Sequence, residues 1–357
     1  MIISKGSKIA SVFQEFIKPS YTLKASTIVS YVNFIKGKGI YIKFDENIEG
    51  LFLKNEDVDF TAQVTNYFVT ILVSLLEKQD AEISFSDGKI YMGGFEFDTK
   101  EVDDYDEPSF TQPHVKFSKE QWAKLERDFK ATTSNAFKNP RIADVINFTV
   151  HQGVLYKTMP SISHWEISKF DATIDDVGLS QAYGHTTKVF GLPHKVWDIL
   201  KYFDDVELLL SDSRITAKAD GISLRYQIYG SKFNAFLERL AERTEGEKLI
   251  NVSLLRVVEP ILKDSVKNAF EQEEDKNCYI TIENNYLNFE VEESARIKFK
   301  VDYTGPKVVI PVNLAVLEYV LGNASDNAEI RTTNKSIIVV DGDKYIMMAN
   351  NGTGISG

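Results

Sequence analysis

Positively charged side chains recur at helical spacing in several parts of this chain. Arg256, Lys263 and Lys267 stand at positions i, i+7 and i+11, which places them on one face of a predicted helix. A second helical segment carries Lys119, Arg127 and Lys130. Cations placed in this way contact phosphates without reading base sequence, and such contacts weaken with added salt. The chemistry indicated is therefore non-specific contact with a nucleic-acid backbone.

Further candidates for phosphate contact lie near other predicted helices and in one loop: Lys5 and Lys8, Lys195 and Lys201, Lys138 and Arg141. The plainer interpretation is that these side chains only solvate exposed helix faces, and for any single residue that interpretation is favoured. Acidic residues also interrupt the pattern, at Glu15, Asp128 and Asp264. The repeated placement on equivalent helices is what favours a phosphate-facing surface.

Catalytic patterns are weak by comparison. The C-terminal Gly352–Gly357 segment matches GxGxxG, but no helix can follow it, so it does not indicate a dinucleotide site. The chain has no GxxxxGK[ST], HExxH or GxSxG pattern, and its five histidines show no zinc spacing. Asp103–Asp104 with Asp106–Glu107 leaves open a two-metal nuclease site. We otherwise expect no catalytic residue, cofactor or resident metal.

Composition sets the limits for these interpretations. The 357 residues carry a net charge of −11, so any DNA contact needs a segregated basic region while the acidic exterior repels DNA elsewhere. Cys278 is the only cysteine, which excludes an intramolecular disulfide. No apolar run is long enough to span a bilayer, and the N-terminus has no export pattern. A cytoplasmic protein without membrane contact is expected.

A single unit is repeated three times along the chain. Residues 81–90, 206–215 and 328–337 align without gaps, and each reads as a strand, a polar turn and a second strand. Their equivalent glutamates are Glu82, Glu207 and Glu329. A further strand follows each hairpin. Repeats of this length predict tandem copies of one supersecondary module.

Two helices accompany each hairpin. The opening helices are marked by apolar residues over 9–17, 122–129 and 254–266, and the later helices by residues over 68–75, 196–203 and 314–321. The second and third of the later helices are expected to begin at Pro193 and Pro311. Acidic and mixed-charge runs over 98–107 and 238–248 are interpreted as connectors.

The predicted fold class is α+β, with two helices packed on antiparallel sheet in each of three tandem domains. The domains are placed at residues 1–108, 109–240 and 241–357.

This plan resembles the bacterial-type DNA sliding clamp, the β subunit of the replicative DNA polymerase. The resemblance covers nearly the whole chain and includes local patterns over 22–42, 115–122 and 345–348. It implies a clamp domain in each repeat, with one chain forming half of a closed ring. It also implies a head-to-tail homodimer around double-stranded DNA, a clamp loader that opens the ring, and a replicative polymerase that docks on it.

The resemblance further implies a hydrophobic peptide pocket between the second and third domains. Its candidate residues here are His164, Trp165, Ile167, Ile346 and Met348. Only the histidine of the family's Gly-His-Arg-Leu segment is kept, and the chain continues past its last strand to Gly357, which departs from the family pattern. These departures suggest a divergent clamp, for example one encoded by a phage or plasmid.

Two alternatives stay open. The chain could be a peptide-binding scaffold that has the clamp fold but does not encircle DNA, which the incomplete basic lining favours. It could also be a DNA-processing enzyme that uses the acidic residues at 103–107.

Overall fold

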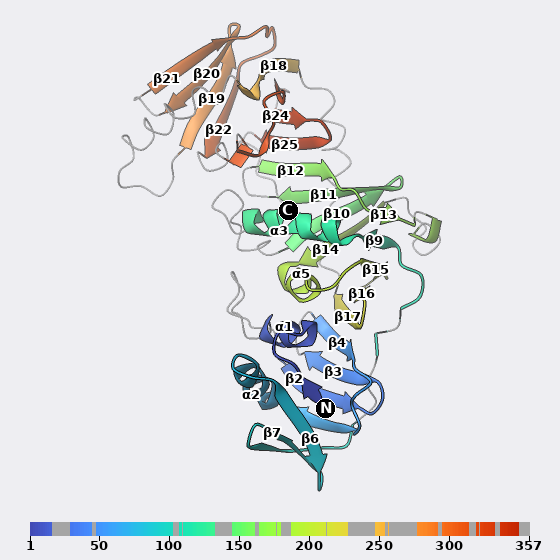
Figure 1. The fold of residues 1–357 in the computed structure, drawn as a ribbon. Coiled ribbons are helices and arrows are strands. Elements are labelled where there is room, and N and C mark those ends of the chain that lie inside the picture. The colour runs from blue at the N-terminus through green and yellow to red at the C-terminus, as the bar shows by residue number, and fades with distance from the viewer. Residues whose placement is uncertain are drawn as a thin grey trace. The chain divides into compact units, whose positions relative to one another are not determined.

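Four strands followed by three more form the recurring unit of this protein, with the short β13 added in the second copy (Figure 1). In the first and second copies a described helix lies between the two sets of strands. The computed structural model describes residues 1–15, 29–44, 48–102, 107–108, 110–132, 145–160, 164–175, 177–179, 187–211, 213–227, 247–253, 256, 277–291, 295–313, 319–320, 322–332 and 336–349. One compact unit comprises Met1–Phe129, Val150–Leu155 and Asp171–Tyr229. The other comprises Lys130–Thr149, Tyr156–Phe170 and Gly230–Gly357.

The first module contains β1 (Ile2–Ile3), α1 (Lys8–Glu15), β2 (Val29–Ile35), β3 (Gly39–Phe44), β4 (Ile48–Lys54), β5 (Ala62–Thr65), α2 (Tyr67–Leu76), β6 (Ala81–Ser86), β7 (Lys89–Met92) and β8 (Phe95–Asp98). α1 and α2 contact each other, and their buried residues include Phe13 and Phe68. The β6–β7 turn places Asp87 and Gly88 at φ of 52° and 72°, the left-handed geometry that suits a two-residue hairpin.

The second module contains β9 (Val115–Phe117), α3 (Lys119–Thr132), β10 (Val145–His151), β11 (Val154–Pro160), β12 (His164–Lys169), β13 (Thr173–Ile174), β14 (Thr187–Pro193), α5 (His194–Leu200), β15 (Val206–Leu210), β16 (Arg214–Ala219) and β17 (Ile222–Gln227). The apolar spacing that predicts α3 buries Trp122, Leu125 and Phe129. Trp197 on α5 donates its indole N–H to the carbonyl oxygen of Trp122 at 3.1 Å, which ties the two helices together.

The third module contains β18 (Glu247–Asn251), β19 (Asn277–Glu283), β20 (Tyr286–Val291), β21 (Ala295–Lys300), β22 (Val308–Asn313), β23 (Glu329–Thr332), β24 (Ser336–Asp341) and β25 (Lys344–Ala349). Its core includes Ile280, Phe289, Ile330 and Ile346. The apolar positions expected to mark the two helices of this module lie outside the described residues. They are Leu254, Val258, Ile261, Leu262 and Val266 for the first helix, and Leu314, Leu317 and Leu321 for the second.

The strand registers confirm that the three modules are equivalent. In each module a short strand, β1, β9 or β18, pairs antiparallel with the hairpin strand that carries the repeated glutamate. The register pairs are Ile2 with Glu82, Lys116 with Glu207, and Asn251 with Glu329. The fold is therefore α+β with three tandem copies of one module, as the sequence repeat predicts.

Two expectations about element boundaries were wrong. Pro311 does not begin a helix but lies inside β22, where it faces Tyr279. β22 is at the end of its sheet, and an edge strand tolerates a residue that lacks an N–H. Glu247 and Lys248 are not part of a connector. They belong to β18, where Lys248 forms a 2.9 Å ion pair with Glu329 on β23.

Neighbouring modules are joined by one repeated rule. β4, the third strand of the first module's opening sheet, pairs antiparallel with β17, the last strand of the second module. β12 pairs in the same way with β25, the last strand of the third module. Among the described strands, β8 and β21 are the two to which this rule assigns no strand of a neighbouring module. Each lies at the end of a four-stranded sheet, paired on one side only.

Candidate nucleic-acid interface

The first helices of the first two modules begin in the same way. The Ser7 hydroxyl accepts a hydrogen bond from the N–H of Ala10, at 3.1 Å, and so caps α1. Ser118 caps α3 through a reciprocal pair, because its hydroxyl accepts from the N–H of Gln121 while the Gln121 side chain accepts from the N–H of Ser118. Lys8 and Lys119 directly follow the two capping serines. They therefore occupy equivalent positions at the start of equivalent helices.

Lys8 and Lys119 converge on one carboxylate, that of Asp204. Lys119 Nζ lies 2.7 Å from Asp204 Oδ1, and Lys8 Nζ lies 3.8 Å from Oδ2. The ammonium group of Lys8 also lies over the Phe203 ring, 5.5 Å from its centroid. The hydrogen bond from Lys119 lowers the pKa of Asp204, so the carboxyl is ionised at neutral pH. All three side chains are about half exposed or more, so the cluster is open to solvent.

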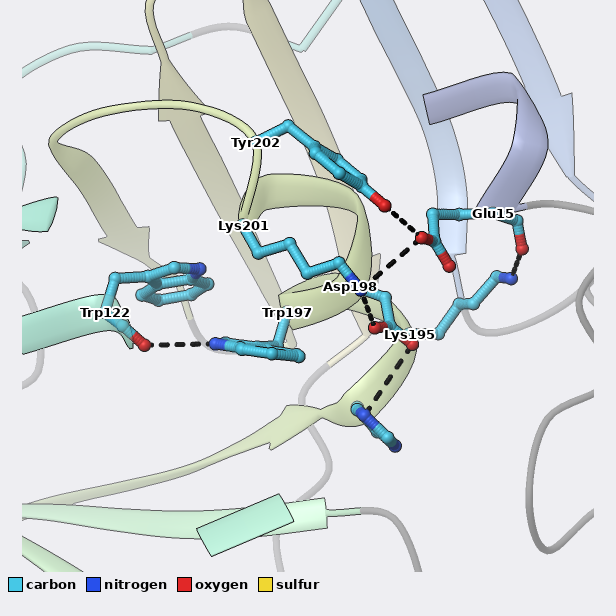
Figure 2. Close-up of polar contacts among 8 residues, drawn as sticks. Glu15, Trp122, Lys195, Trp197, Asp198, Lys201 and Tyr202 are labelled. Carbon is cyan, nitrogen blue, oxygen red and sulfur yellow. Dashed lines mark hydrogen bonds and ion pairs between the residues drawn. The ribbon is translucent and has the colours of Figure 1, made fainter. Parts of the chain in front are cut away.

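Glu15 holds a second group of predicted phosphate-binding residues (Figure 2). It ends α1 and is only 1% exposed. Lys195 donates to its backbone carbonyl oxygen, and the Tyr202 hydroxyl donates to Oε1. Lys201 Nζ lies 3.4 Å from the same Oε1 and 2.7 Å from Asp198 Oδ1. Because this acid is buried among donors, these contacts fasten α1 to α5 rather than leaving Lys195 and Lys201 extended into solvent.

Tyr202, which is partly buried, keeps its proton in this cluster. Burial, together with the hydrogen bond to Glu15, raises the pKa of Tyr202 to about 12. The phenol is therefore a hydrogen-bond donor to Glu15 throughout the neutral range.

The remaining predicted phosphate contacts differ in their surroundings. Arg127 and Lys130 lie on the exposed side of α3. Lys5 donates to the carbonyl oxygen of Glu77 at 2.6 Å, and Arg256 pairs with Asp326 and with the carbonyl oxygen of Ala324. The positions Lys138, Arg141, Lys263 and Lys267 lie outside the described residues.

The predicted peptide pocket falls on two paired strands, β12 and β25. His164 faces Met348 across the ladder, Trp165 faces Met347, and Ile167 faces Tyr345. The backbone register therefore places these positions on adjacent strands. Ile167 is 0% exposed and Ile346 is 1% exposed, however, so neither side chain presents a surface to a peptide in this conformation.

A buried ionic cluster lies on the same strands. Glu166 on β12 is 1% exposed, and its carboxylate accepts a 2.6 Å hydrogen bond from the Tyr319 hydroxyl. Lys157 Nζ on β11 lies 3.8 Å from Glu166 Oε1, and Lys344 Nζ on β25 lies 3.5 Å from it. Lys344 also lies over the Tyr319 ring. One acid therefore links three strands and a helical residue inside the protein.

Sequence reasoning did not find Asp204, Tyr202 or the Glu166 cluster. The partners of Asp204 are far from it in the chain, and no local pattern indicates which lysines a surface acid meets. The acids at 103–106 lie outside the described residues. In the described part of the chain, no group of His, Cys, Asp or Glu could hold a metal ion, and no helix is long and apolar enough to cross a membrane.

Comparison with solved structures identifies the architecture. The DNA polymerase III subunit beta of Pseudomonas aeruginosa superposes with a TM-score of 0.67 at 16% identity, covering 98% of this chain and 99% of that one. A putative DNA polymerase III beta subunit from Eubacterium rectale gives a TM-score of 0.66 at 12% identity, covering 99% of each chain. The chain has the sliding-clamp fold.

The sequence itself matches no protein-family model and no curated protein. Another structure with the sliding-clamp fold is the Helicobacter pylori beta clamp bound to a DNA ligase peptide, with a TM-score of 0.63 at 13% identity and 98% coverage of both chains. At these identities the likeness concerns the fold, which is kept over nearly the full length although most side chains differ.

Proposed function

We propose that this chain is a DNA polymerase processivity factor without catalytic activity, which forms a homodimeric ring around duplex DNA. The observation that carries this proposal is the rule by which modules join. β4 pairs with β17 and β12 pairs with β25, so the third strand of one module's opening sheet always meets the last strand of the next module. The same rule applied between two copies pairs β21 of one with β8 of the other. This contact is head-to-tail, and repeating it closes a ring.

The two free edges are complementary in sequence and in charge. β8 reads Phe95-Glu96-Phe97-Asp98, and β21 reads Ala295-Arg296-Ile297-Lys298-Phe299-Lys300. Phe97 is buried against the first module, while Ile297 and Phe299 pack against the third module's core. A β8–β21 strand pair that places Phe97, Ile297 and Phe299 on one face of the sheet has the acids of β8 and the bases of β21 on the other face. Opposite charges then meet across the pair.

Exposed aromatic side chains gather at the same edges. Phe95 on β8 is 45% exposed, and Tyr67 near Phe97 is also exposed. Tyr286 on β20, which neighbours β21 and lies under the Lys298 ammonium, is exposed as well. Apolar groups that remain exposed beside an open strand edge are typical of a surface that a partner covers.

The exposed cations of α1 and α3 are proposed to face the duplex. Phosphate contacts of exposed lysine and arginine are independent of base sequence, so DNA can move through the ring while topology prevents its escape. The chain carries 52 acidic residues against 41 basic ones, and this excess of negative charge keeps the rest of the surface repulsive to DNA.

Partners are proposed to dock on the β12–β25 strands through short peptides. A relative with the sliding-clamp fold was solved with a DNA ligase peptide bound, which supports peptide docking as a property of this architecture. For this chain the partners would be a replicative DNA polymerase and a clamp loader, in the cytoplasm and associated with the nucleoid. The closed packing of Ile167 and Ile346 means that docking requires these strands to adjust.

The test combines mass and topology. Light scattering is expected to give twice the 40.5 kDa of one chain. The protein is then concentrated with a nicked circular plasmid, so that protomers close around it, and passed through gel filtration at a salt concentration that removes phosphate contacts. Retention on the circle and loss from the same plasmid after linearisation supports the ring. A stable monomer, or equal retention on both forms, rejects it.

A second candidate is a peptide-binding scaffold that has the sliding-clamp fold but does not encircle DNA. It is favoured by the engagement of Lys8, Lys119, Lys195, Lys201 and Arg256 with acids or carbonyl oxygens of the chain itself. The plasmid experiment separates it from the ring, because a scaffold stays on neither DNA form.

A further inference from the structure

Lys8 and Lys119 are the equivalent lysines of two repeated modules, and both are held by a residue whose aligned position is Gln79 in the first repeat and Asp326, which pairs with Arg256, in the third. The residue after α5 that holds them is Asp204, whereas the corresponding stretch after α2 reads Lys78-Gln79-Asp80, where Asp80 accepts from the backbone N–H of Lys5. Asp204 therefore links the starts of α1 and α3. These are the helices whose cations are proposed to face DNA.

We propose that the Asp204 carboxylate competes with DNA phosphates for Lys8 and Lys119. It pairs with both lysines when no phosphate is bound and so lowers the affinity of the ring for the duplex. A carboxylate and a phosphate oxygen offer the same ligand chemistry to a lysine, an anionic acceptor for a charge-assisted hydrogen bond. The inference rests on the proposed function and concerns how tightly the ring holds DNA, not whether it closes.

The ion pairs of Asp204 are open to solvent, so a phosphate can replace the carboxylate. Asp204 is 49% exposed, and Lys8 and Lys119 are exposed to 52% and 68%. Exposed ion pairs contribute little to stability, so an approaching phosphate can displace the carboxylate at small cost. The buried Glu15 cluster differs in this respect, because its acid is closed off from solvent and holds helices together.

The consequence is a weaker DNA contact than the lysine count predicts. Each phosphate contact must first break a lysine–Asp204 pair, which subtracts the energy of that pair from binding. A ring that holds DNA by topology gains from this, because weak contacts leave it free to slide while closure prevents dissociation.

The test compares Asp204→Asn with a matched control, Glu56→Gln. Glu56, just after β4, forms an exposed 2.9 Å ion pair with Lys54. Each variant therefore removes one negative charge, and Asp204→Asn releases two lysines where Glu56→Gln releases one. Binding to a short linear duplex is measured by fluorescence anisotropy between 50 and 200 mM salt. Asp204→Asn is expected to bind more tightly, on the order of 2- to 10-fold, with a salt slope steeper by about one to two. Glu56→Gln is expected to match the wild type.

Two further variants secure the interpretation. Asp204→Glu keeps the charge and is expected to behave like the wild type, and Asp204→Ser is expected to repeat the gain. Adding Lys8→Gln and Lys119→Gln to Asp204→Asn is expected to remove it.

The outcomes separate the two proposals. Equal effects of Asp204→Asn and Glu56→Gln, or weaker binding by Asp204→Asn, overturn the competitor role while leaving the ring intact. A wild type that is not retained on circular plasmid overturns the ring, whatever the Asp204 variants do on linear duplex.

Discussion

Glu166 shows how much a single buried acid can determine in this fold. Its carboxylate faces Lys157, Lys344 and the Tyr319 hydroxyl, and both Glu166 and Lys157 are almost fully buried. Removing one partner of a buried ionic cluster leaves the opposite charge in a medium that solvates it poorly. The cluster lies on the strands that join the second and third modules, so its loss affects a junction rather than a local surface.

Glu166→Gln is therefore expected to lower the free energy of unfolding by about 3 kcal/mol. Glutamine keeps the shape and an acceptor for Tyr319 but leaves two lysines facing a neutral group. Glu329→Gln is the control, because Glu329 also meets two cations, Lys248 and Arg331, at a more exposed site, where the loss should be about 1 kcal/mol or less. Urea unfolding followed by tryptophan fluorescence, at one fixed protein concentration, gives both values. A Glu166→Gln loss no larger than that of the control contradicts the assignment.

At the scale of the element, α3 is the helix that offers the clearest test of the phosphate-contact hypothesis. Its apolar side is buried through Trp122, Leu125 and Phe129, while Arg127 and Lys130 remain on its solvent side. A helix fixed in this way presents its cations in a constant direction. Their contribution to DNA binding should then be additive and visible in the salt dependence.

The double variant Arg127→Glu, Lys130→Glu is expected to weaken duplex binding uniformly across sequences and to reduce the salt slope by about two. Lys36→Glu, Lys38→Glu makes the same charge change in the exposed β2–β3 turn and is the control. Anisotropy titrations at several salt concentrations measure both. If the turn variant weakens binding as much as the helix variant, only net charge matters and α3 does not face DNA.

The elements that sequence reasoning predicts well are those with a local signal. α1, α2, α3 and α5 follow from apolar periodicity, and the hairpins from alternation around a polar turn. β18 was missed because a charged strand looks like a connector until its ion-pair partner on β23 is known. The Asp204 and Glu166 clusters were missed for the same reason. Lys119 is 85 residues from Asp204 and Tyr319 is 153 residues from Glu166, so tertiary packing decides which of these residues meet.

At the scale of the whole molecule, the free edges β8 and β21 carry opposite charges on matching alternations. Charges placed directly opposite across a strand pair contribute up to about 1 kcal/mol each, and like charges oppose pairing by similar amounts. A ring of two copies contains this contact twice. Its stability should therefore depend strongly on which edge carries which sign.

Two variants exploit this dependence. Glu96→Lys with Asp98→Lys makes both edges of a chain basic, and Arg296→Glu with Lys298→Glu and Lys300→Glu makes both edges acidic. Each variant alone is expected to be monomeric by light scattering, because every contact then opposes like charges. Glu56→Lys with Asp59→Lys makes the same charge change as the first variant away from the edges and should remain dimeric.

Mixing the two edge variants is expected to restore a species of twice the chain mass. In a head-to-tail ring of one copy of each, the basic β8 meets an acidic β21 at one contact, and the acidic β8 meets a basic β21 at the other. A symmetric dimer gives a different result: if β8 paired with β8, changing β21 alone would leave the dimer intact, and if β21 paired with β21, changing β8 alone would. Recovery only in the mixture therefore requires both edges in one closed assembly, which is the geometry that encircling a duplex demands.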